Sequence, residues 1–170
     1  MPDNPSQITS ATAIASSSAR LHVALIEPEI HPNTGNIARL CAANDVTLHL
    51  VGRLGFRIDD KAVRRAGLDY WPYVDLRRHH SLEEFYAALP QARFYYYTTK
   101  ATKPYTSVTY QPNDCLVFGS ETSGLPRHLL EANWDRALKI PMRSPHVRSL
   151  NLATAVAIVL YEALRQIESF

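Results

Sequence analysis

The stretch Lys139–Gln166, KIPMRSPHVRSLNLATAVAIVLYEALRQ, decides the fold, because it joins a strand end, a polar loop and a long apolar helix. The strand is expected to end at Pro141, which has no N–H to donate to a neighbouring strand. Residues 143–148 form a polar loop, and Ser149 or Asn151 caps the helix that follows. This helix is apolar on nearly all sides, so it must be buried on more than one side.

Two interpretations of the C-terminal helix remain open. It either packs wholly inside the core or is shared between the core and a second subunit. It is too short and too rich in alanine for a typical membrane span, and no other segment predicts one. The pattern favours neither interpretation over the other.

The composition is that of an ordinary globular protein. The 170 residues suffice for one domain, 46% of them are apolar, and the net charge is only +2. Cys41 and Cys115 lie inside apolar runs, which is typical of reduced core cysteines in a cytoplasmic protein. No cysteine, histidine or carboxylate cluster has zinc-site spacing, so no metal is expected. Residues 1–20 are rich in Ser, Ala and Thr without periodicity and predict a disordered tail that is not a signal peptide.

The rest of the chain predicts alternating strands and helices. Strands are expected over 21–26, 46–51, 70–76, 94–99, 114–119 and 137–141. Helices are expected over 37–43, 59–66, 81–89 and 127–132, and from Ser149 onward, with the His79-His80 pair in a solvated loop. Strand, helix and strand within about thirty residues form a βαβ unit, which predicts an α/β fold with a parallel sheet flanked by helices. Residues 21–170 are expected to form one domain.

Three loops are candidates for a ligand site, because each follows a predicted strand. They span residues 27–36, 119–126 and 141–151, and all are rich in Gly, Ser, Asn or Pro. Ligands of open α/β sheets bind beyond the carboxyl ends of the strands. Taken singly, each loop is more often an ordinary turn. The chain has no G-x-S-x-G elbow, no phosphate-binding loop and no G-x-G-x-x-G fingerprint, so the pattern alone predicts only a ligand site built from loops.

The same loops carry a resemblance to a known family. EPEIHPNTGNIAR at 27–39, FGSETSGLP at 118–126, and IPM at 140–142 with RSLNL at 148–152 resemble the three ordered motifs of the SPOUT methyltransferases. The segment RAGLDY at 65–70 is most similar to the tRNA (cytidine/uridine-2'-O) methyltransferases that act on the wobble ribose, position 34. The resemblance implies S-adenosylmethionine as methyl donor, the tRNA anticodon stem-loop as partner, a C-terminal trefoil knot and a homodimer packed through helices.

The resemblance also assigns residues to the cofactor. Five would surround S-adenosylmethionine: Tyr97, Gly119, Ile140, Ser149 and Leu150. The backbone of Ile140 and Leu150 would address the adenine, and Gly119 would let the cofactor approach closely. Glu121 would hold the loops of the knot, or else form an ordinary salt bridge within its loop.

Arg39 and Asn33 are the catalytic candidates that the resemblance implies. Arg39 would meet the target nucleotide at a site shared between subunits, unless it is simply a surface arginine of its helix. Guanidinium does not readily lose a proton, so we expect Arg39 to hold the adjacent phosphate as a forked donor and not to act as the base. Asn33 and Asn151 would order the loops through side-chain hydrogen bonds. The reaction is expected to need no metal.

A further set of residues is expected to contact RNA. Lys61, Arg64 and Arg65 share one face of the predicted helix 59–66, and with Arg148 they are candidates for phosphate contacts. A basic helix face is equally often just solvated. Tyr161 would lie at the dimer-linked active site, or pack in the core.

Three functional hypotheses follow. The first is 2'-O-methylation of the wobble nucleotide of tRNA. The second keeps the enzyme class but moves the target to another ribose of tRNA or ribosomal RNA. The third is a catalytically silent dimer that binds RNA or a nucleotide. The lack of an added RNA-binding domain in residues 1–20 favours tRNA as the substrate.

Overall fold

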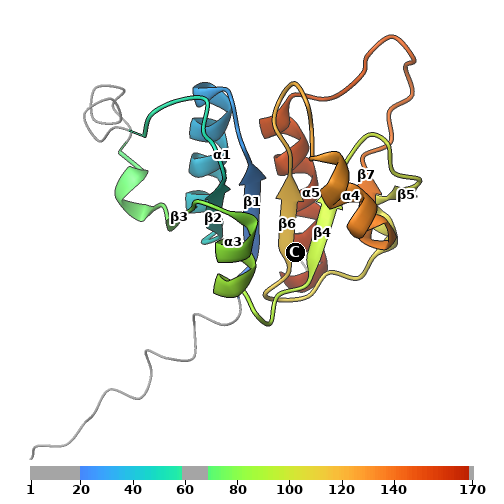
Figure 1. The fold of residues 1–170 in the computed structure, drawn as a ribbon. Coiled ribbons are helices and arrows are strands. Elements are labelled where there is room, and N and C mark those ends of the chain that lie inside the picture. Colours follow the sequence, from blue (N-terminus) through green and yellow to red (C-terminus); the bar gives the residue numbers. More distant parts are fainter. Residues whose placement is uncertain (1–19, 59–68, 169–170) are drawn as a thin grey trace, which may run out of the picture.

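The computed structural model describes residues 20–58 and 69–168. Within these residues seven strands form one sheet in the order β3-β2-β1-β6-β4-β7-β5 (Figure 1). Every adjacent pair is parallel, which confirms the predicted fold class. The strands are β1 (His22–Ile26), β2 (Thr47–Val51), β3 (Leu76–His79), β4 (Phe94–Tyr97), β5 (Lys103–Pro104), β6 (Cys115–Phe118) and β7 (Ala137–Lys139). The expected tail, apart from Arg20, and the expected helix with Lys61, Arg64 and Arg65 lie outside the described residues.

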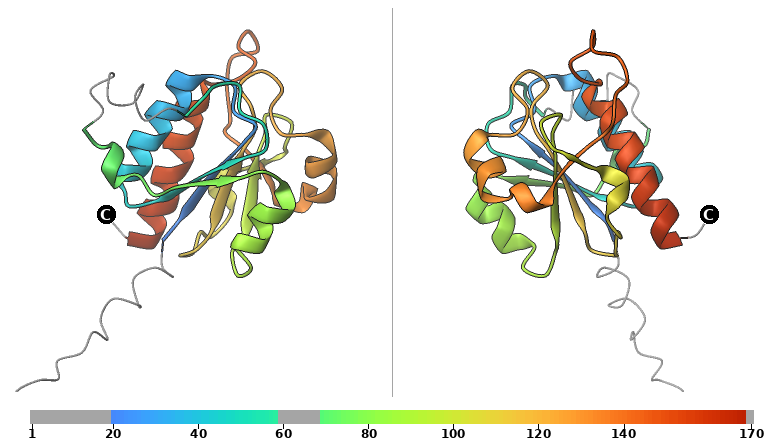
Figure 2. Two further views of the ribbon diagram at one scale, coloured as in Figure 1. Left: turned by 60° about the vertical axis from the view of Figure 1, so that its left-hand side comes forward. Right: turned by 90° about the vertical axis from the view of Figure 1, so that its right-hand side faces the viewer.

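Helices cover both faces of the sheet. The α-helices are α1 (His31–Ala43), α3 (Leu82–Ala88), α4 (Arg127–Ala132) and α5 (Leu152–Glu168). Short 3-10 turns are η1 (Trp71–Tyr73), η2 (Tyr105–Ser107) and η3 (Trp134–Arg136). In Figure 2, α1 and α5 lie side by side on one face, and α3 and α4 cover the other.

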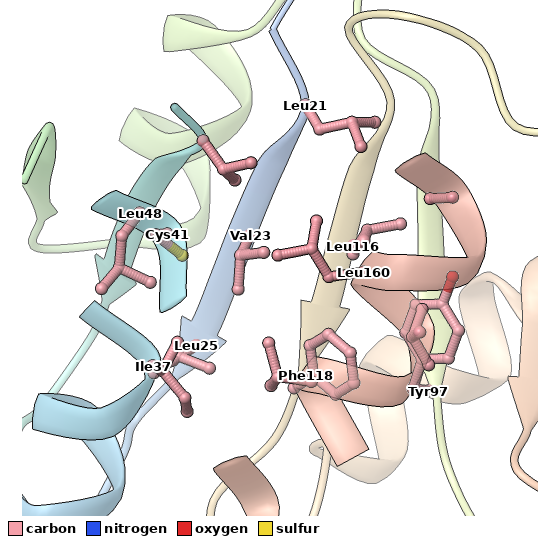
Figure 3. Close-up of a cluster of buried hydrophobic side chains, with 14 of the residues drawn as sticks. Leu21, Val23, Leu25, Ile37, Cys41, Leu48, Tyr97, Leu116, Phe118 and Leu160 are labelled. Carbon is pink, nitrogen blue, oxygen red and sulfur yellow. The ribbon is translucent and has the colours of Figure 1, made fainter. Parts of the chain in front are cut away.

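The core is divided by the sheet into two apolar clusters. Val23 and Leu25 of β1 and Leu116 and Phe118 of β6 point toward α1 and α5, where Leu160 meets them (Figure 3). The alternate residues of the same strands pack against α3 and α4. All five residues of β1 are therefore buried, as expected for a parallel strand covered on both faces.

Helix α5 packs against this core over part of its surface. Five of its side chains are buried: Val156, Val159, Leu160, Ala163 and Leu164. At its start Asn151 Oδ1 accepts hydrogen bonds from the backbone N–H of Ala153 (2.9 Å) and Thr154 (3.3 Å). Of the two predicted caps, Asn151 is thus the one used.

The start of α1 differs from the prediction. The helix begins at His31 instead of residue 37, so Asn33 and Thr34 lie inside it and do not cap it. Ile30 occupies the cap position without a side-chain cap bond, and its backbone N–H donates instead to Glu121 (2.9 Å). Pro32 fits the first turn, where a missing N–H costs nothing. A contact from a distant loop therefore sets where this helix begins.

The predicted strand over 70–76 is also wrong. Residues 71–73 form η1 around Pro72, and the strand β3 comes later, at Leu76–His79. The polar stretch Arg77-Arg78 lies in this strand because β3 is the edge of the sheet, where charged side chains remain in water and hinder pairing with other chains. His79, expected in a solvated loop, is buried.

Three histidines form a buried row across β1, β2 and β3. Asn113 Oδ1 lies 3.0 Å from His22 Nε2, His22 Nδ1 lies 3.1 Å from His49 Nε2, and His49 Nδ1 lies 2.9 Å from His79 Nε2. Asn113 Oδ1 can only accept, so each histidine in turn donates from Nε2, and His22 and His49 accept at Nδ1. The row is complete only when the rings of His22 and His49 are neutral.

This row is expected to make the protein sensitive to acid. Burial first, and then the nearby charges of His22, His79 and Arg77, lower the pKa of His49 from 6.5 to about 3. In the unfolded chain His49 binds a proton as the pH falls through about 6.5, whereas in the folded chain it stays neutral until the pH approaches 3. The stabilising contribution is therefore present above pH 6.5 and is lost as the pH falls toward 3, by about 1.4 kcal/mol per pH unit.

Urea unfolding at pH 7.5, 6 and 5 measures this dependence. Between pH 6.5 and 5 the His49 contribution alone is expected to cost about 2 kcal/mol. His49→Gln should be less stable at pH 7.5 and should show a shallower slope below pH 6.5. Equal slopes in the two proteins would contradict the assignment.

Candidate cofactor cavity and its loops

One cavity of about 440 Å³ lies at the carboxyl ends of β4, β6 and β7. Its volume is in the range of small-molecule sites, roughly 300–1,000 Å³. The loop after β6 and the segment that joins β7 to α5 form much of its wall. The structure places all five predicted cofactor residues in this wall: Tyr97, Gly119, Ile140, Ser149 and Leu150. Residues from three distant segments thus surround one space.

Tyr97 lines the cavity, and its ring is buried in the core behind it. The ring stacks on Phe118 at 4.7 Å between centroids, with 14° between the planes. Its hydroxyl lies 2.9 Å from that of Tyr110. Burial, followed by the neighbouring Tyr110, raises the pKa of Tyr97 well above its usual value. Tyr97 is therefore a neutral, fixed part of the cavity wall.

Gly119 is required by the fold of its own loop. The chain turns back after β6, and Ser120 and Gly124 exchange backbone hydrogen bonds of 3.3 and 3.0 Å. A Cβ on Gly119 would lie 2.0 Å from the carbonyl carbon of Gly124 and 2.1 Å from the nitrogen of Leu125. The glycine was expected to admit the cofactor, but its most immediate role is to admit the returning backbone.

Glu121 joins the loop after β6 to the start of α1. Its carboxylate accepts hydrogen bonds from the backbone N–H of Glu29 (2.8 Å) and Ile30 (2.9 Å) and from the Asn33 amide (3.3 Å). The Asn33 oxygen in turn accepts from the Asn151 amide at 3.0 Å. We call Glu121, Asn33 and Asn151 the loop clamp. It connects all three loops. Glu121 makes this connection by accepting hydrogen bonds, two of them from backbone N–H groups, and not by forming a salt bridge within its own loop.

The environment of Glu121 favours its charged form. Burial on its own would raise the pKa of this carboxyl. The backbone hydrogen bonds from Glu29, Glu121 itself and Ile30, together with Asn33, outweigh burial and lower the pKa. The clamp therefore operates with a carboxylate.

Glu121→Ala is expected to destabilise the fold by about 2 kcal/mol, because three donors lose a charged acceptor and partly turn to water. Affinity for the cofactor that the three motifs imply should fall with it, since the loop that carries Glu121 lines the cavity. Urea unfolding and calorimetry measure the two effects. Glu131→Ala is the matched control, because Glu131 is an exposed helix residue whose loss should cost under about 0.5 kcal/mol. Equal effects of the two substitutions would argue against the clamp.

The predicted RNA and catalytic residues are spread more widely. Arg148 lines the cavity together with the cofactor residues. Asn33 is buried in the clamp, whereas Arg39 is exposed on α1 and is not part of the cavity wall. Tyr161 is 45% exposed on α5 and accepts a hydrogen bond from Asn44 at the end of α1 (3.3 Å), away from the cavity. One copy of the chain therefore does not bring Arg39 and Tyr161 to the cavity.

Two groups of residues were missed by the sequence reasoning. Thr98, Thr99 and Lys100 follow β4 and line the cavity. Thr98 and Thr99 were expected inside the strand 94–99, and only Lys100 was expected directly after it. Tyr70 lies against Arg39, with the guanidinium carbon 5.5 Å from the ring centroid. No local pattern could have paired these two residues, which are far apart in the sequence.

Two features are absent from residues 20–58 and 69–168. No group of three or more His, Cys, Asp or Glu side chains there is arranged to hold a metal ion. In the same residues no helix has the length and apolar character needed to cross a membrane. Cys41 and Cys115 are buried free thiols, and burial raises the pKa of Cys41 to about 12.

Comparison with known proteins fits this geometry. The tRNA (cytidine(34)-2'-O)-methyltransferase of Escherichia coli K12 is 47% identical over 148 residues, 86% of this chain and 94% of that protein. A solved structure described as giving insight into 2-OH methylation of C/U34 on tRNA is 44% identical, with a TM-score of 0.83 over 90% of this chain and 99% of that one.

A more distant structure is the SpoU methyltransferase AviRb of Streptomyces viridochromogenes in complex with the cofactor AdoMet. It is 25% identical, with a TM-score of 0.76 over 95% of this chain and 66% of that one. The sequence profile of the SpoU rRNA methylase family matches residues 20–161. The resemblance drawn from the three motifs is thereby confirmed, and this chain belongs to the SpoU rRNA methylase family.

Proposed function

We propose that this protein transfers a methyl group from S-adenosylmethionine to the ribose 2'-OH of the wobble nucleotide, cytidine or uridine 34, in the anticodon loop of tRNA. The observation that carries the proposal is the 47% identity to the E. coli enzyme of that name, which extends over 94% of the E. coli protein. The fold agrees with it, because the solved structure that concerns 2-OH methylation of C/U34 on tRNA matches 90% of this chain with a TM-score of 0.83.

The cavity residues fit S-adenosylmethionine. The aliphatic residues Ile140 and Leu150 in the cavity wall offer apolar surface for an adenosine. Lys100 and Arg148 supply two cations at the same cavity for an amino-acid carboxylate, while Glu121 is occupied by the loop clamp. When bound, this cofactor supplies an activated methyl group on a sulfonium.

The chain itself aligns the nucleophile and shields it from water. Because the donor is already activated, positioning of the 2'-OH is the main contribution expected of the protein. Arg39 holds the phosphate next to the target ribose through two parallel N–H donors. Asn33 fixes the first turn of α1, and so the position from which Arg39 extends, through the clamp. Lys61, Arg64 and Arg65 bind further phosphates.

A homodimer completes the site in this proposal. What supports it is that Arg39 does not line the cavity of its own chain, so a second copy, packed through helices such as α5, would bring its Arg39 to the cavity. Tyr161 would then lie near the shared site. The trefoil knot is proposed for the segment from β6 to α5, where the clamp ties the third loop against the first two. Residues 21–170 would form this one domain behind a tail of residues 1–20, acting in the cytoplasm without a metal.

The test is methyl transfer from labelled S-adenosylmethionine to total tRNA from a strain lacking the gene, followed by mapping of the labelled nucleoside. Label in 2'-O-methylated cytidine or uridine at position 34 is the expected result. Label at another ribose would refute the substrate assignment but keep the reaction. Binding of S-adenosylmethionine without any transfer to tRNA or ribosomal RNA would favour the silent RNA-binding dimer.

A further inference from the structure

Tyr70 contacts the exposed face of α1 at two points one helical turn apart. Its ring lies beneath the Arg39 guanidinium, 5.5 Å from centroid to guanidinium carbon. Its hydroxyl donates a hydrogen bond to the backbone carbonyl of Gly35 at 3.3 Å. Gly35 and Arg39 are four residues apart and so share one face of the helix. The ring is thus anchored to the same helix whose arginine it supports.

Arg39 has no ion pair to hold it among the described residues. It is exposed, and none of the ion pairs between described side chains includes it. A free arginine side chain has about 2 kcal/mol of rotamer entropy to lose when it is fixed on a ligand. A cation–π contact restricts the guanidinium without neutralising its charge and without occupying its N–H donors.

We infer that Tyr70 is a positioning residue that holds the Arg39 guanidinium ready for the phosphate next to the target ribose. This inference rests on the proposed function of Arg39. Tyr70 is not among the residues that line the cavity of its own chain, so we expect it to act on Arg39 and not on the cofactor. Its aromatic ring carries the effect, and its hydroxyl only steadies the ring.

The test compares Tyr70→Leu with Tyr70→Phe in single-turnover methylation of tRNA and in tRNA binding. Tyr70→Leu removes the aromatic face and is expected to lower both the rate at limiting tRNA and the affinity for tRNA by about 5-fold, as for an exposed cation–π contact. Tyr70→Phe keeps the face and should stay within about 2-fold of the unaltered protein. Affinity for S-adenosylmethionine should not change in either variant.

A double-mutant cycle with Arg39→Gln separates positioning from a merely structural role. In the Arg39→Gln background Tyr70→Leu should have no further effect on tRNA affinity. The same 5-fold loss in that background would overturn the inference, and so would a Tyr70→Phe variant as impaired as Tyr70→Leu. If the unaltered protein binds tRNA but transfers no methyl group, the proposed function fails, and the binding cycle still decides the role of Tyr70. Tyr70→Gln, which also lacks an aromatic face, replaces Tyr70→Leu should the latter not fold.

Discussion

Arg39→Ala is expected to lower methyl transfer to tRNA by at least about 100-fold while affinity for S-adenosylmethionine stays within about 2-fold. The first effect follows because a nucleophile that is displaced by about 1 Å reacts roughly 100-fold more slowly. The second follows because Arg39 is exposed on α1 and does not line the cavity. Single-turnover methylation measures the rate, and calorimetry measures cofactor binding.

Arg127→Ala is the matched control for this prediction. Arg127 is a helical arginine whose side chain is 89% exposed, and its helix, α4, covers the opposite face of the sheet from α1. Its i,i+4 pair with Glu131 should contribute less than about 0.5 kcal/mol. An Arg39→Ala protein that methylates tRNA as fast as Arg127→Ala would refute the role given to Arg39. Loss of cofactor binding in Arg39→Ala would place Arg39 in the cofactor site.

Gly119→Ala is expected to destabilise the protein by about 3 kcal/mol or more and to abolish cofactor binding. The added Cβ would meet the Gly124 carbonyl carbon at 2.0 Å. The position of the Cβ is fixed by the backbone of residue 119, and the carbonyl carbon is itself backbone, so neither atom can rotate away as the end of a side chain would. Overpacking of side chains alone costs about 1–3 kcal/mol, and a backbone displacement adds to that. The loop that has to shift also lines the cavity.

Gly35→Ala provides the comparison. Gly35 lies within α1, and apart from that helix's own backbone a Cβ there meets no atom of the described residues within 4 Å. Alanine there should leave the free energy of unfolding unchanged or raise it by up to about 1 kcal/mol, since glycine is a poor helix former. Urea unfolding of both variants is the measurement. A Gly119→Ala protein as stable as Gly35→Ala, with cofactor binding intact, would contradict the account of the loop.

Elements with strong local signals agree with the sequence prediction. Helix α4 has the predicted bounds, and β1 and β6 fall inside their apolar runs. Ser81, at the predicted start of its helix, caps α3 by accepting from the Glu84 N–H at 3.1 Å, and the Glu84 carboxylate accepts from the backbone N–H of His80. Such features depend on residues a few positions apart, so the sequence alone determines them. The three motifs likewise identified the family and two of the loops that line the cavity, 119–126 and 141–151, whereas loop 27–36 contributes no residue to its wall.

Tertiary contacts decided the features that the local pattern gave wrongly or left open. α1 begins six residues earlier than predicted, at His31 and not at 37, because Glu121, some ninety residues away, accepts the N–H groups just before it. β3 is a strand despite Arg77 and Arg78, because it pairs with β2 at the edge of the sheet.

The same holds for the site. Position 119 requires glycine because the backbone of residues 124 and 125 folds back onto it. The ring that contacts the Arg39 guanidinium belongs to a tyrosine thirty-one positions later. Local propensity and periodicity are set by neighbours along the chain, and they determined that this protein is a parallel α/β domain with sites at its strand ends. The exact start of a helix, the space beside a glycine and the support of an arginine depend on groups that meet only when the chain has folded, so the tertiary structure alone decided them.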